Sequence, residues 1–430
     1  MKRRVVITGM GAITPLGLTP EETWQNLLAS KSGIRPIRIF EAETFPTTFA
    51  AQVPAEFDIR RYVRDPSAVK MAGRNVLFAL AAARSAMDDS GLAPGDYDPS
   101  RFGIYLGSGE GVLDFMTTAW CMSDSIGKDG DINTARFAEL GLERFDPRRE
   151  LEVEPHLPAS HIACEHGLCG PAYSCLTACA ASTQATGEAM ELIRTGRADL
   201  MLTGGTHSMI HPLGIAGFNL LTALSVEPKD QPWKASRPFD RNRAGFVLGE
   251  GSTVMILEEL EHARRRGARI WAELTGFGSS ADAYRMTDIQ PEGRGAAAAI
   301  RMALQDAAVG PEDIDYISAH GTGTQENDRV ESLAVKAVFG EFAYRVPISS
   351  VKSMLGHLIA AAGATELMTC VLAIRDQIVP PTTNLETPDP DCDLDYVPNV
   401  ARKVKVEVCL SNSFGFGGQN DALVVRRYVA

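Results

Sequence analysis

The sequence lacks any apolar run of the about 20 residues that a membrane-spanning helix needs. Its first residues, MKRRVVITGMGAITPLG, join a basic end to a short apolar stretch, but Gly9, Gly11 and Pro15 interrupt that stretch. A secretory signal needs a longer apolar core. We therefore expect a cytoplasmic chain without a membrane span.

Cysteine is scarce, with eight among 430 residues, so a disulfide framework is excluded and reduced thiols are expected. Several potential metal ligands do gather in HIACEHGLCGPAYSCLTAC, between His161 and Cys179. However, no Cys-x-x-Cys pair occurs and Gly170-Pro171 divides the group. We predict no metal site there and expect ordinary small buried residues at Cys164, Cys169 and Cys175.

Positive charge is also in deficit, because 42 Lys and Arg face 54 Asp and Glu, for a net charge of −12. Such a chain repels polyanions, so nucleic acid is not expected as a partner. Nucleotide motifs fail as well: Gly9-x-Gly11 is followed by Thr14 where a dinucleotide fingerprint requires glycine, and no P-loop occurs. We expect no cofactor.

Short apolar and β-branched runs alternate with helical ones, which predicts an α/β protein with largely parallel sheets. The expected strands are 3–11, 101–111, 198–207, 252–260, 270–280, 313–324, 346–352, 406–418 and 421–428. The expected helices cover roughly 20–34, 71–90, 180–195, 257–266, 294–308, 328–339 and 357–375.

Segments in the first half of the chain are similar in sequence to segments in the second half. GIYLGSGEG is similar to YISAHGTGT, and MLTGGTHS…STVMILEEL is similar to CLSNSFGFGG…DALVVRRY. This predicts two similar halves, residues 1–255 and 256–430. Residues 121–158 are polar and turn-rich, and we expect them to form an excursion on the surface.

Cys179 lies at the start of the helical run CAASTQATGEAMELIRTG, among small neighbours. Unpaired N–H groups in the first turn of a helix favour a thiolate, so an accessible Cys179 would be a nucleophile without an adjacent base. The local sequence fits a tight helix-packing site equally well.

Two histidines, like Cys179, lie at a join between two segments of structure. We call each such join, where a strand or loop leads into a loop or helix, a corner. His320 ends the strand DIDYISAH, and His357 opens the run GHLIAAAGATELMTCVLAI after the strand VPISSVKSM. A helix N-terminus favours the neutral imidazole, which donates a hydrogen bond without carrying charge. Singly, each histidine is more typical of a structural role; three reactive side chains at three similar corners favour a shared site.

The motifs TACAAS, AHGTGT, SSVKSMLGHLIAAAGATE and NSFGFGGQN, with RPFDRNRAGFVLGEG and the opening VVITGMGAITPLG, occur along nearly the whole chain. In order and spacing they resemble the elongating β-ketoacyl-acyl-carrier-protein synthases with a Cys-His-His triad. The resemblance implies the thiolase-like fold, with two βαβαβαββ halves in five αβαβα layers. It also implies a homodimer, with a heterodimer as the alternative.

The resemblance implies specific roles. Cys179 would accept an acyl group from acyl-carrier protein, with the N–H groups of Cys179 and Phe416 as the oxyanion hole. His320 and His357 would hold the thioester carbonyl of malonyl-carrier protein during loss of CO₂, and the enolate would attack acyl-Cys179. The supporting residues implied are Lys352 and Glu366 near the triad, Thr322 and Thr324 for pantetheine, and Phe414 beside the Phe416 gate.

Glu366 is out of helical phase with His357, so a buried Glu366 should pair with Lys352 or with backbone nearby. Glu110 occupies an acyl-pocket position that is commonly apolar in the family, and it would disfavour a long saturated chain or face its own loop. A basic cluster is the expected landing surface for the acidic carrier protein, with a solvated charged face as the alternative: Arg60, Arg61, Arg64, Lys70 and Arg74.

The rival interpretation is a non-catalytic partner similar to the chain-length factors of ketosynthase heterodimers. Such partners usually lack the cysteine, whereas this chain has Cys179 and both histidines. Initiating ketosynthases use Cys-His-Asn, and His357 argues against them. A thiolase fits less well, because the histidine pair indicates decarboxylation.

Overall fold

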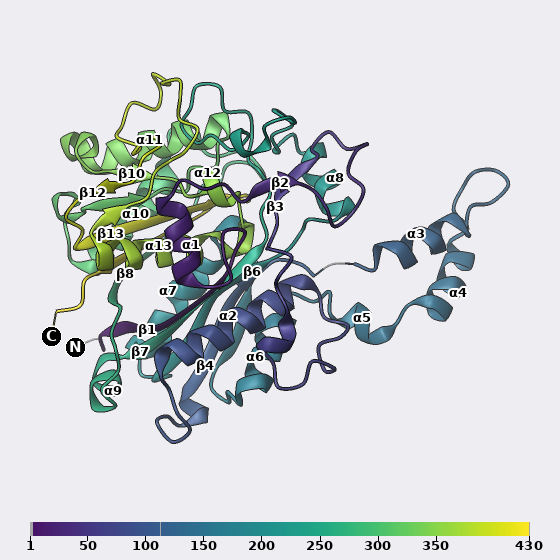
Figure 1. Ribbon diagram of the computed structural model, residues 1–430, viewed down its shortest axis with the longest axis horizontal. Coiled ribbons are helices and arrows are strands. Elements are labelled where there is room, and N and C mark those ends of the chain that lie inside the picture. The colour runs from purple at the N-terminus through teal and green to yellow at the C-terminus, as the bar shows by residue number, and fades with distance from the viewer. Residues whose placement is uncertain (1–2, 112, 430) are drawn as a thin grey trace.

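One continuous sheet of ten strands forms the frame of the computed structural model, which describes residues 3–111 and 113–429 (Figure 1). Its strand order is β10-β9-β13-β14-β8-β1-β7-β6-β4-β5. The strands are β1 (Val5–Ile13), β4 (Phe102–Ser108), β5 (Ala172–Cys175), β6 (Leu200–His207), β7 (Gly251–Glu259), β8 (Ala272–Ala281), β9 (Tyr316–Ser318), β10 (Ile348–Ser349), β13 (Val408–Gly415) and β14 (Gln419–Arg426).

The sheet consists of two equivalent halves. Each half has five strands, and in both halves the order across the sheet is third, second, fourth, fifth and first in the chain. The halves meet where β1 pairs with β8, with Val5 opposite Leu274. The predicted internal similarity is therefore confirmed.

The expectation of largely parallel sheets is wrong. Parallel pairing is confined to the outer three strands of each half, and every pairing from β6 through β1 and β8 to β13 is antiparallel. One physical reason is the connection of β13 to β14, which is a short turn from Gly415 to Gln419, whereas the connection from β6 to β7 is long and contains α8 (Pro212–Leu220). A direct return places neighbouring strands antiparallel.

Helices cover the strands in layers. Two central helices, α7 (Ala181–Arg194) and α13 (Ala362–Asp376), contact strands of both halves. On the outer faces, α2 (Arg74–Ser90) packs on β1, β7 and β6, while α10 (Arg294–Ala307) packs on β8 and β14 and carries α11 (Gln325–Phe339). The predicted arrangement of two βαβαβαββ halves in five αβαβα layers is confirmed.

The central layer is fully enclosed. Every residue of α13 from 362 to 374 is buried, as expected for a helix without a polar face. A Cβ atom at Gly363 would lie 1.9 Å from Thr183 Oγ1 of α7, so only glycine allows the two central helices to approach this closely.

The remaining elements are short or peripheral. The helices are α1 (Pro20–Leu28), α6 (Leu157–His166), α8 (Pro212–Leu220), α9 (Leu260–Arg265) and α12 (Lys352–Leu355), and the minor strands are β2 (Ile34–Pro36), β3 (Phe49–Ala51), β11 (Ile378–Val379) and β12 (Arg402–Lys403). The 3₁₀ turns are η1 (Ile59–Arg61), η2 (Pro99–Arg101), η3 (Ala178–Ala180), η4 (Pro232–Lys234), η5 (Pro311–Asp313), η6 (Gly340–Tyr344) and η7 (Ile359–Ala361).

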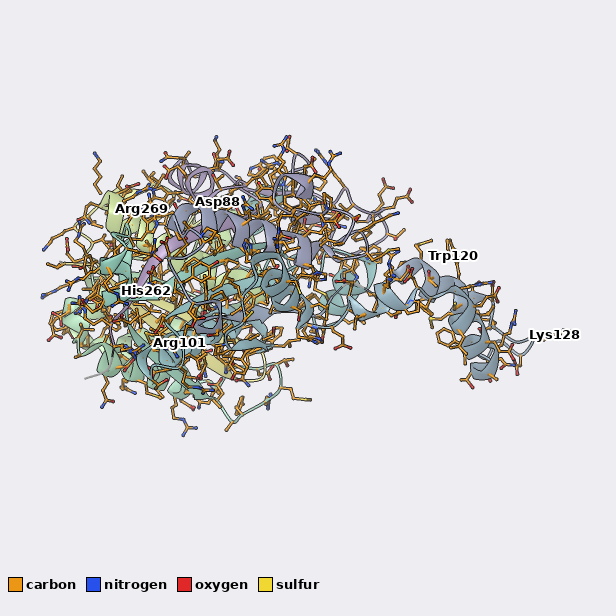
Figure 2. The ribbon with its side chains drawn as sticks, turned by 90° about the horizontal axis from the view of Figure 1, so that it is seen from below. Asp88, Arg101, Trp120, Lys128, His262 and Arg269 are labelled. Carbon is orange, nitrogen blue, oxygen red and sulfur yellow. The ribbon has the colours of Figure 1, made fainter. Side chains whose placement is uncertain are left out.

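An arm, residues 113–153, extends from the body, and the labels Trp120 and Lys128 mark its outer part (Figures 1 and 2). It contains α3 (Phe115–Ser123), α4 (Thr134–Arg144) and α5 (Pro147–Leu151), each capped by an Asp or Asn side chain. The predicted surface excursion is confirmed, but it is mostly helical rather than a chain of turns. Its apolar side chains are largely exposed, including Met116, Trp120 and Leu142.

Over residues 3–111 and 113–429, no helix combines the length and the apolar character that crossing a membrane requires. The division of the chain into 1–255 and 256–430 stays a prediction. Since β7 runs across residue 255 and belongs to the first five strands, we propose that the first half extends through α9.

Candidate active site

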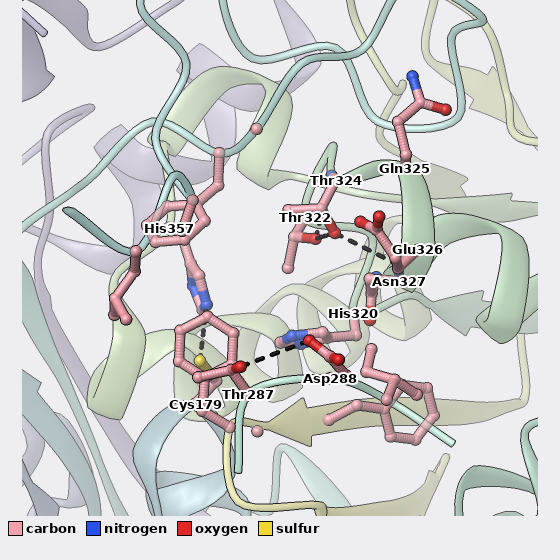
Figure 3. A pocket seen from close by; sticks show the side chains of 18 of the residues that line it. Cys179, Thr287, Asp288, His320, Thr322, Thr324, Gln325, Glu326, Asn327 and His357 are labelled. Carbon is pink, nitrogen blue, oxygen red and sulfur yellow. Dashed lines mark hydrogen bonds between the residues drawn. The ribbon is translucent and has the colours of Figure 1, made fainter. Parts of the chain in front are cut away.

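Cys179, His320 and His357 converge on one cavity (Figure 3). His357 Nε2 lies 3.0 Å from Cys179 Sγ, and the rings of His320 and His357 are 5.4 Å apart between centroids. One donor atom from each of the three residues lies within 4.8 Å of the others. The corners of both halves therefore meet at one point, although their catalytic roles stay predictions.

Cys179 lies in the turn η3, one residue after Ala178, whose φ of 48° is unusual for a residue with a side chain. The α-helix begins just after it, at Ala181. The expected thiolate is not favoured, because burial raises the pKa of the Cys179 thiol to about 11. Lys352 and the Phe416 N–H oppose this rise without cancelling it.

His357 does not open a helix, contrary to the prediction. It precedes η7, and α13 begins only at Ala362. The tautomer of its ring is instead fixed by the backbone, because Ile359 N–H donates a hydrogen bond to Nδ1 at 3.3 Å. The remaining proton of a neutral ring is then on Nε2, the nitrogen that faces the cysteine sulfur.

His320 follows β9 and is held by Lys352. The Lys352 Nζ donates to the His320 carbonyl at 2.5 Å and lies 3.4 Å from His320 Nδ1. An ammonium group has no acceptor, so Nδ1 must accept and the ring proton belongs to Nε2. Burial, followed by the Lys352 charge, lowers the pKa of both histidines well below the usual value. The site thus contains two neutral N–H donors.

Lys352 and Glu366 form a buried ion pair. Of the two partners expected for a buried Glu366, Lys352 or backbone nearby, the structure has Lys352. Burial raises the pKa of Glu366 to about 7, against the opposing effect of Lys352. The pair keeps the Lys352 ammonium beside His320, where it acts on the imidazole without touching the cavity.

The cavity has a volume of about 370 Å³. Its walls include the predicted pantetheine-binding residues Thr322 and Thr324 and the predicted gate residues Phe414 and Phe416. The backbone N–H groups of Phe416 and Cys179 lower the pKa of the Cys179 thiol, against the effect of burial. Their role as the donors of an oxyanion hole stays a prediction.

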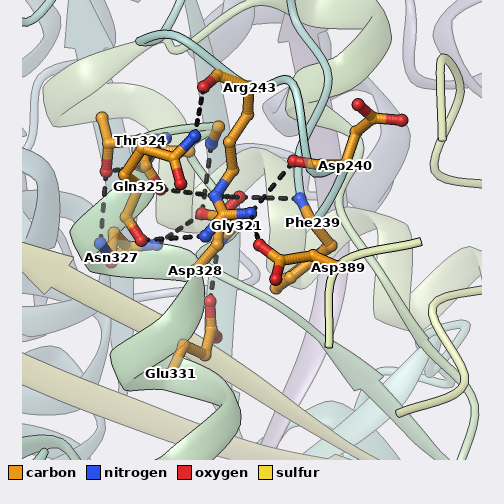
Figure 4. A network of polar contacts seen from close by, with 12 residues as sticks. Phe239, Asp240, Arg243, Gly321, Thr324, Gln325, Asn327, Asp328, Glu331 and Asp389 are labelled. Carbon is orange, nitrogen blue, oxygen red and sulfur yellow. Dashed lines mark hydrogen bonds and ion pairs between the residues drawn. The ribbon is translucent and has the colours of Figure 1, made fainter. Parts of the chain in front are cut away.

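A buried polar network holds the loop that carries His320 (Figure 4). Glu331 accepts from the N–H groups of His320 and Gly321, at 2.8 and 2.7 Å, and Asp328 accepts from Phe239 N–H at 2.7 Å. Arg243 lies 3.6 Å from Asp328 and also pairs with Asp389. These residues were not predicted from the sequence. The spacing of Asp328 and Glu331, three residues apart after the Thr324 cap, indicates only that both carboxylates share one helix face.

His207 is a second missed residue. It ends β6, is buried, and has no hydrogen-bond partner for either ring nitrogen among the described residues. A Cβ at Gly109 would lie 2.3 Å from His207 Nδ1, so the ring occupies the space that this glycine leaves. Burial lowers the pKa of His207 to about 3.

Other predicted residues lie outside the cavity. Glu110 follows β4 and is exposed, and it is not among the cavity walls. In the basic cluster, Arg60 pairs with Asp58, Arg64 with Glu165, and Arg74 with the buried Glu250. Arg61 and Lys70 are exposed. The roles given to these residues stay predictions.

The three cysteines that precede Cys179 were expected to be buried, and this expectation is wrong. Cys164 and Cys169 are exposed and Cys175 is half-buried, because they lie on α6, on the loop after it, and on the terminal strand β5. His161 contacts Glu152 at 2.9 Å. Within the described parts of the chain, Cys179, His320 and His357 form the only group of such side chains placed closely enough to hold a metal ion.

Comparisons with known proteins match most of the chain to one family. Residues 2–263 match the family model "Beta-ketoacyl synthase, N-terminal domain", and residues 271–386 match "Beta-ketoacyl synthase, C-terminal domain". The 3-oxoacyl-[acyl-carrier-protein] synthase 2 of Coxiella burnetii is 44% identical over 426 residues, 99% of each chain.

Two solved structures, each 37% identical and covered over 100% of both chains, are similar as well. One is the ishigamide ketosynthase/chain length factor, with a TM-score of 0.88. The other, with a TM-score of 0.85, is a type II polyketide synthase acyl-carrier protein in complex with its ketosynthase bound to the hexaketide.

Proposed function

The chain belongs to the β-ketoacyl synthase family, and from this premise we propose that it joins an acyl chain on Cys179 to malonyl-acyl-carrier protein with loss of CO₂. The observation that carries the proposal is the convergence of one sulfur and two neutral imidazole donors on one cavity. The product is a β-ketoacyl-carrier protein, longer by two carbons.

The first step is acyl transfer. The Cys179 sulfur attacks the thioester carbonyl of acyl-carrier protein, the carrier thiol leaves with the proton of Cys179, and the acyl group remains on the enzyme. The N–H groups of Cys179 and Phe416, both of which lower the pKa of the Cys179 thiol, are proposed to donate to the oxyanion that forms on the thioester carbonyl. Loss of one such donor costs about 10²–10³-fold in turnover.

The second step is decarboxylation. The thioester carbonyl of malonyl-carrier protein would accept hydrogen bonds from the Nε2–H groups of His320 and His357 while its carboxylate leaves as CO₂. Neutral donors suit this step because they stabilise the enolate oxygen without binding the starting carboxylate as an ion pair. The enolate carbon then attacks acyl-Cys179, and the Cys179 sulfur leaves as a thiolate that takes a proton from solvent to restore the thiol.

Lys352 and Glu366 are proposed as positioning residues. Lys352 keeps the His320 proton on Nε2 by donating to Nδ1, and Glu366 balances the buried ammonium charge. Thr322 and Thr324 line the same cavity and are proposed to bind the pantetheine arm.

A second subunit is part of the proposal. β5 is the terminal strand of the sheet, and Ala172 and Tyr173 on it are exposed. Because an open sheet edge favours pairing with another strand, we propose a homodimer, or a heterodimer of the kind in the ishigamide ketosynthase/chain length factor structure. Light scattering of the purified chain, alone and with a co-expressed partner, distinguishes the two.

The alternative of a non-catalytic chain-length-factor-like subunit is less supported, because the chain retains Cys179 and both histidines in contact geometry. The relatives include both a 3-oxoacyl-[acyl-carrier-protein] synthase and a putative polyketide beta-ketoacyl synthase, so the acyl substrate must be identified by assay. We also propose a cytoplasmic location, where Cys179 stays reduced.

The test is intact-protein mass spectrometry after incubation with acyl-carrier protein, followed by malonyl-carrier protein. We expect one acyl adduct on Cys179 that disappears as a β-ketoacyl-carrier protein forms. An unmodified Cys179 across acyl chains of several lengths and degrees of unsaturation would overturn the proposal in favour of the non-catalytic subunit.

A further inference from the structure

The three side chains that meet at the cavity are close enough together to hold a metal ion. One ligand atom from each of Cys179, His320 and His357 lies within 4.8 Å of the others, and His357 Nε2 lies 3.0 Å from the cysteine sulfur (Figure 3). A thiolate with two imidazoles is a ligand set that suits Zn²⁺. Whether the set accepts a metal ion depends on which ring nitrogens carry protons, because a protonated nitrogen has no free lone pair.

The backbone beside His357 fixes the tautomer that cannot bind a metal ion next to the cysteine. Ile359 N–H donates to His357 Nδ1 at 3.3 Å, so the lone pair of the neutral ring is on Nδ1 and the proton is on Nε2. Nε2 is the nitrogen that faces the Cys179 sulfur. A metal ion at the sulfur would therefore meet an N–H group of His357 and not a lone pair.

A side chain fixes the same tautomer in His320. Lys352 Nζ lies 3.4 Å from His320 Nδ1 and donates to the His320 carbonyl at 2.5 Å. The ion pair with the buried Glu366 keeps the ammonium in this place. Moving the ring proton from Nε2 to Nδ1 would set an N–H group against an ammonium, which has only donors. His320 therefore also presents an N–H group, and not a lone pair, to the cavity.

Histidines that bind metal ions in proteins have the opposite surroundings. Their second ring nitrogen usually donates its N–H to a carboxylate, a carbonyl or a water, and this leaves the lone pair of the other nitrogen for the metal. In this site the positions of those acceptors are taken by two donors, the Lys352 ammonium and the Ile359 N–H. The positive charge of Lys352 also repels a divalent cation.

We propose that Lys352 is a positioning residue that keeps thiophilic metal ions such as Zn²⁺ out of the Cys179 site, because it holds His320 in the tautomer that cannot ligate. Ile359 N–H has the same effect on His357. The proposal goes beyond the condensation reaction and does not depend on it. Its consequence is that the contacts which turn two N–H donors toward the cavity also protect the sulfur from capture by a metal ion.

The test is metal binding by the purified full chain, with Co²⁺ and Zn²⁺ as the probes. The test variant combines Lys352→Gln with Glu366→Gln. It removes the ammonium, supplies an amide oxygen that can accept from Nδ1–H, and removes the carboxylate that would otherwise lose its partner. The matched control is Lys352→Arg, which retains a cation that only donates. Binding of Co²⁺ is followed by sulfur-to-cobalt charge-transfer absorption, and the affinity for Zn²⁺ by competition with a chromophoric chelator.

We expect the double variant to bind Zn²⁺ about 10- to 100-fold more tightly than the wild type, which is the range by which partners of the second ring nitrogen alter metal affinity. The charge-transfer band should appear with Co²⁺ in the double variant and should disappear when Cys179→Ala is added, which also subtracts ions bound elsewhere. Lys352→Arg should bind no more tightly than the wild type.

Three results would overturn the proposal. They are a Cys179-dependent affinity in the wild type as strong as in the double variant, a folded double variant without a gain in affinity, or a gain in Lys352→Arg.

Nitrogen-15 NMR of the histidine-labelled wild-type chain tests the same point if the double variant does not fold. A proton on Nε2 of His320 and His357 would support the proposal, and a proton on Nδ1 of either ring would overturn it. The signals are assigned by their loss in His320→Ala and His357→Ala. A wild-type chain that excludes metal ions but is not acylated by acyl-carrier protein would contradict the proposed function alone.

Discussion

The two halves of the molecule contain the same turn, but only one of these turns carries a nucleophile. In the first half Ala178, with φ 48°, precedes Cys179 and leads through η3 into α7. In the second half Ile359, with φ 44°, precedes Ala360 and leads through η7 into α13. The backbone strain is repeated and the chemistry is not, so the fold provides the corner and the side chain decides its use.

The second half contributes hydrogen-bond donors instead. His320 follows β9, and His357 lies two residues before η7. The tautomer of each ring is fixed by a neighbour in the same half, Lys352 for His320 and Ile359 for His357. The end of β4, the first-half counterpart of β9, has Gly109, and the ring of His207 occupies the space beside it. The comparison thus predicts a division of labour, with covalent chemistry in the first half and enolate stabilisation in the second.

The largest expected effect comes from removing the nucleophile. Cys179→Ala should reduce condensation by more than about 10⁴-fold, because no sulfur remains to carry the acyl group. Cys179→Gln should also abolish condensation but retain release of CO₂ from malonyl-carrier protein, since both histidine donors remain. Carbon dioxide release and product formation are measured in parallel. Robust condensation by either variant would contradict the division of labour.

The pH dependence of Cys179 alkylation tests the raised pKa of its thiol. A pKa of about 11 means that the thiolate fraction grows about tenfold per pH unit from pH 7 to pH 10, so the rate with iodoacetamide should rise about 10³-fold. A thiolate stabilised as the sequence predicted would give a plateau below pH 8.5. The exposed Cys164 is the internal reference, resolved by peptide mapping.

Removing one of the two histidine donors in the second half should slow decarboxylation but leave acylation of Cys179 in the first half intact. His320→Ala and His357→Ala should each slow release of CO₂ from malonyl-carrier protein by about 10²–10³-fold, while acylation of Cys179 by the acyl-carrier donor persists. The measurement pairs the CO₂ assay with mass spectrometry of the acyl-enzyme. Equal loss of acylation and decarboxylation would mean that the two halves do not divide the reaction.

The smallest effect concerns His207, on stability. Its folded-state pKa of about 3 lies below the ordinary value of 6.5, so the unfolded chain binds a proton that the folded chain excludes, and stability falls as pH decreases from 6.5 to 3. At pH 5 this costs about 2 kcal/mol. The measurement is the free energy of unfolding in urea at pH 7.5 and at pH 5. The decrease between these two pH values should be smaller in His207→Gln than in the wild type, by about 2 kcal/mol.

The exposed His156 provides the control, since His156→Gln should keep the wild-type acid response. If His207→Gln lost as much stability on acidification as the wild type, the protonated His207 ring would have a hydrogen-bond acceptor in the folded protein, and the prediction would be wrong.

The sequence was sufficient to predict which three side chains meet, but not how burial changes the pKa of the Cys179 thiol. Motifs around residues 179, 320 and 357 predicted the meeting point, and repeated strand patterns predicted the two halves. The antiparallel centre of the sheet was missed, because a strand's sequence does not reveal which neighbour it pairs with. The raised thiol pKa of Cys179 was missed as well, since local sequence predicted the helix start and not the burial that outweighs it.

The arm and the polar network were also beyond local patterns. Residues 121–158 are polar and turn-rich in sequence, yet α4 and α5 form there because Asn133 and Asp146 side chains cap their first turns. The pairing of Arg74 with Glu250 joins residues 176 positions apart, a contact that no spacing rule contains. The predicted Lys352–Glu366 pair succeeded because a buried carboxylate has few possible partners.

The enclosed helix α13 has a consequence for biosynthesis. Its buried surface is covered by strands from both halves. A nascent chain that has emerged only as far as residue 255 therefore lacks α13 and β14, both of which pack on the apolar face of α7. The interior can close only after β14, which ends at Arg426, has left the ribosome.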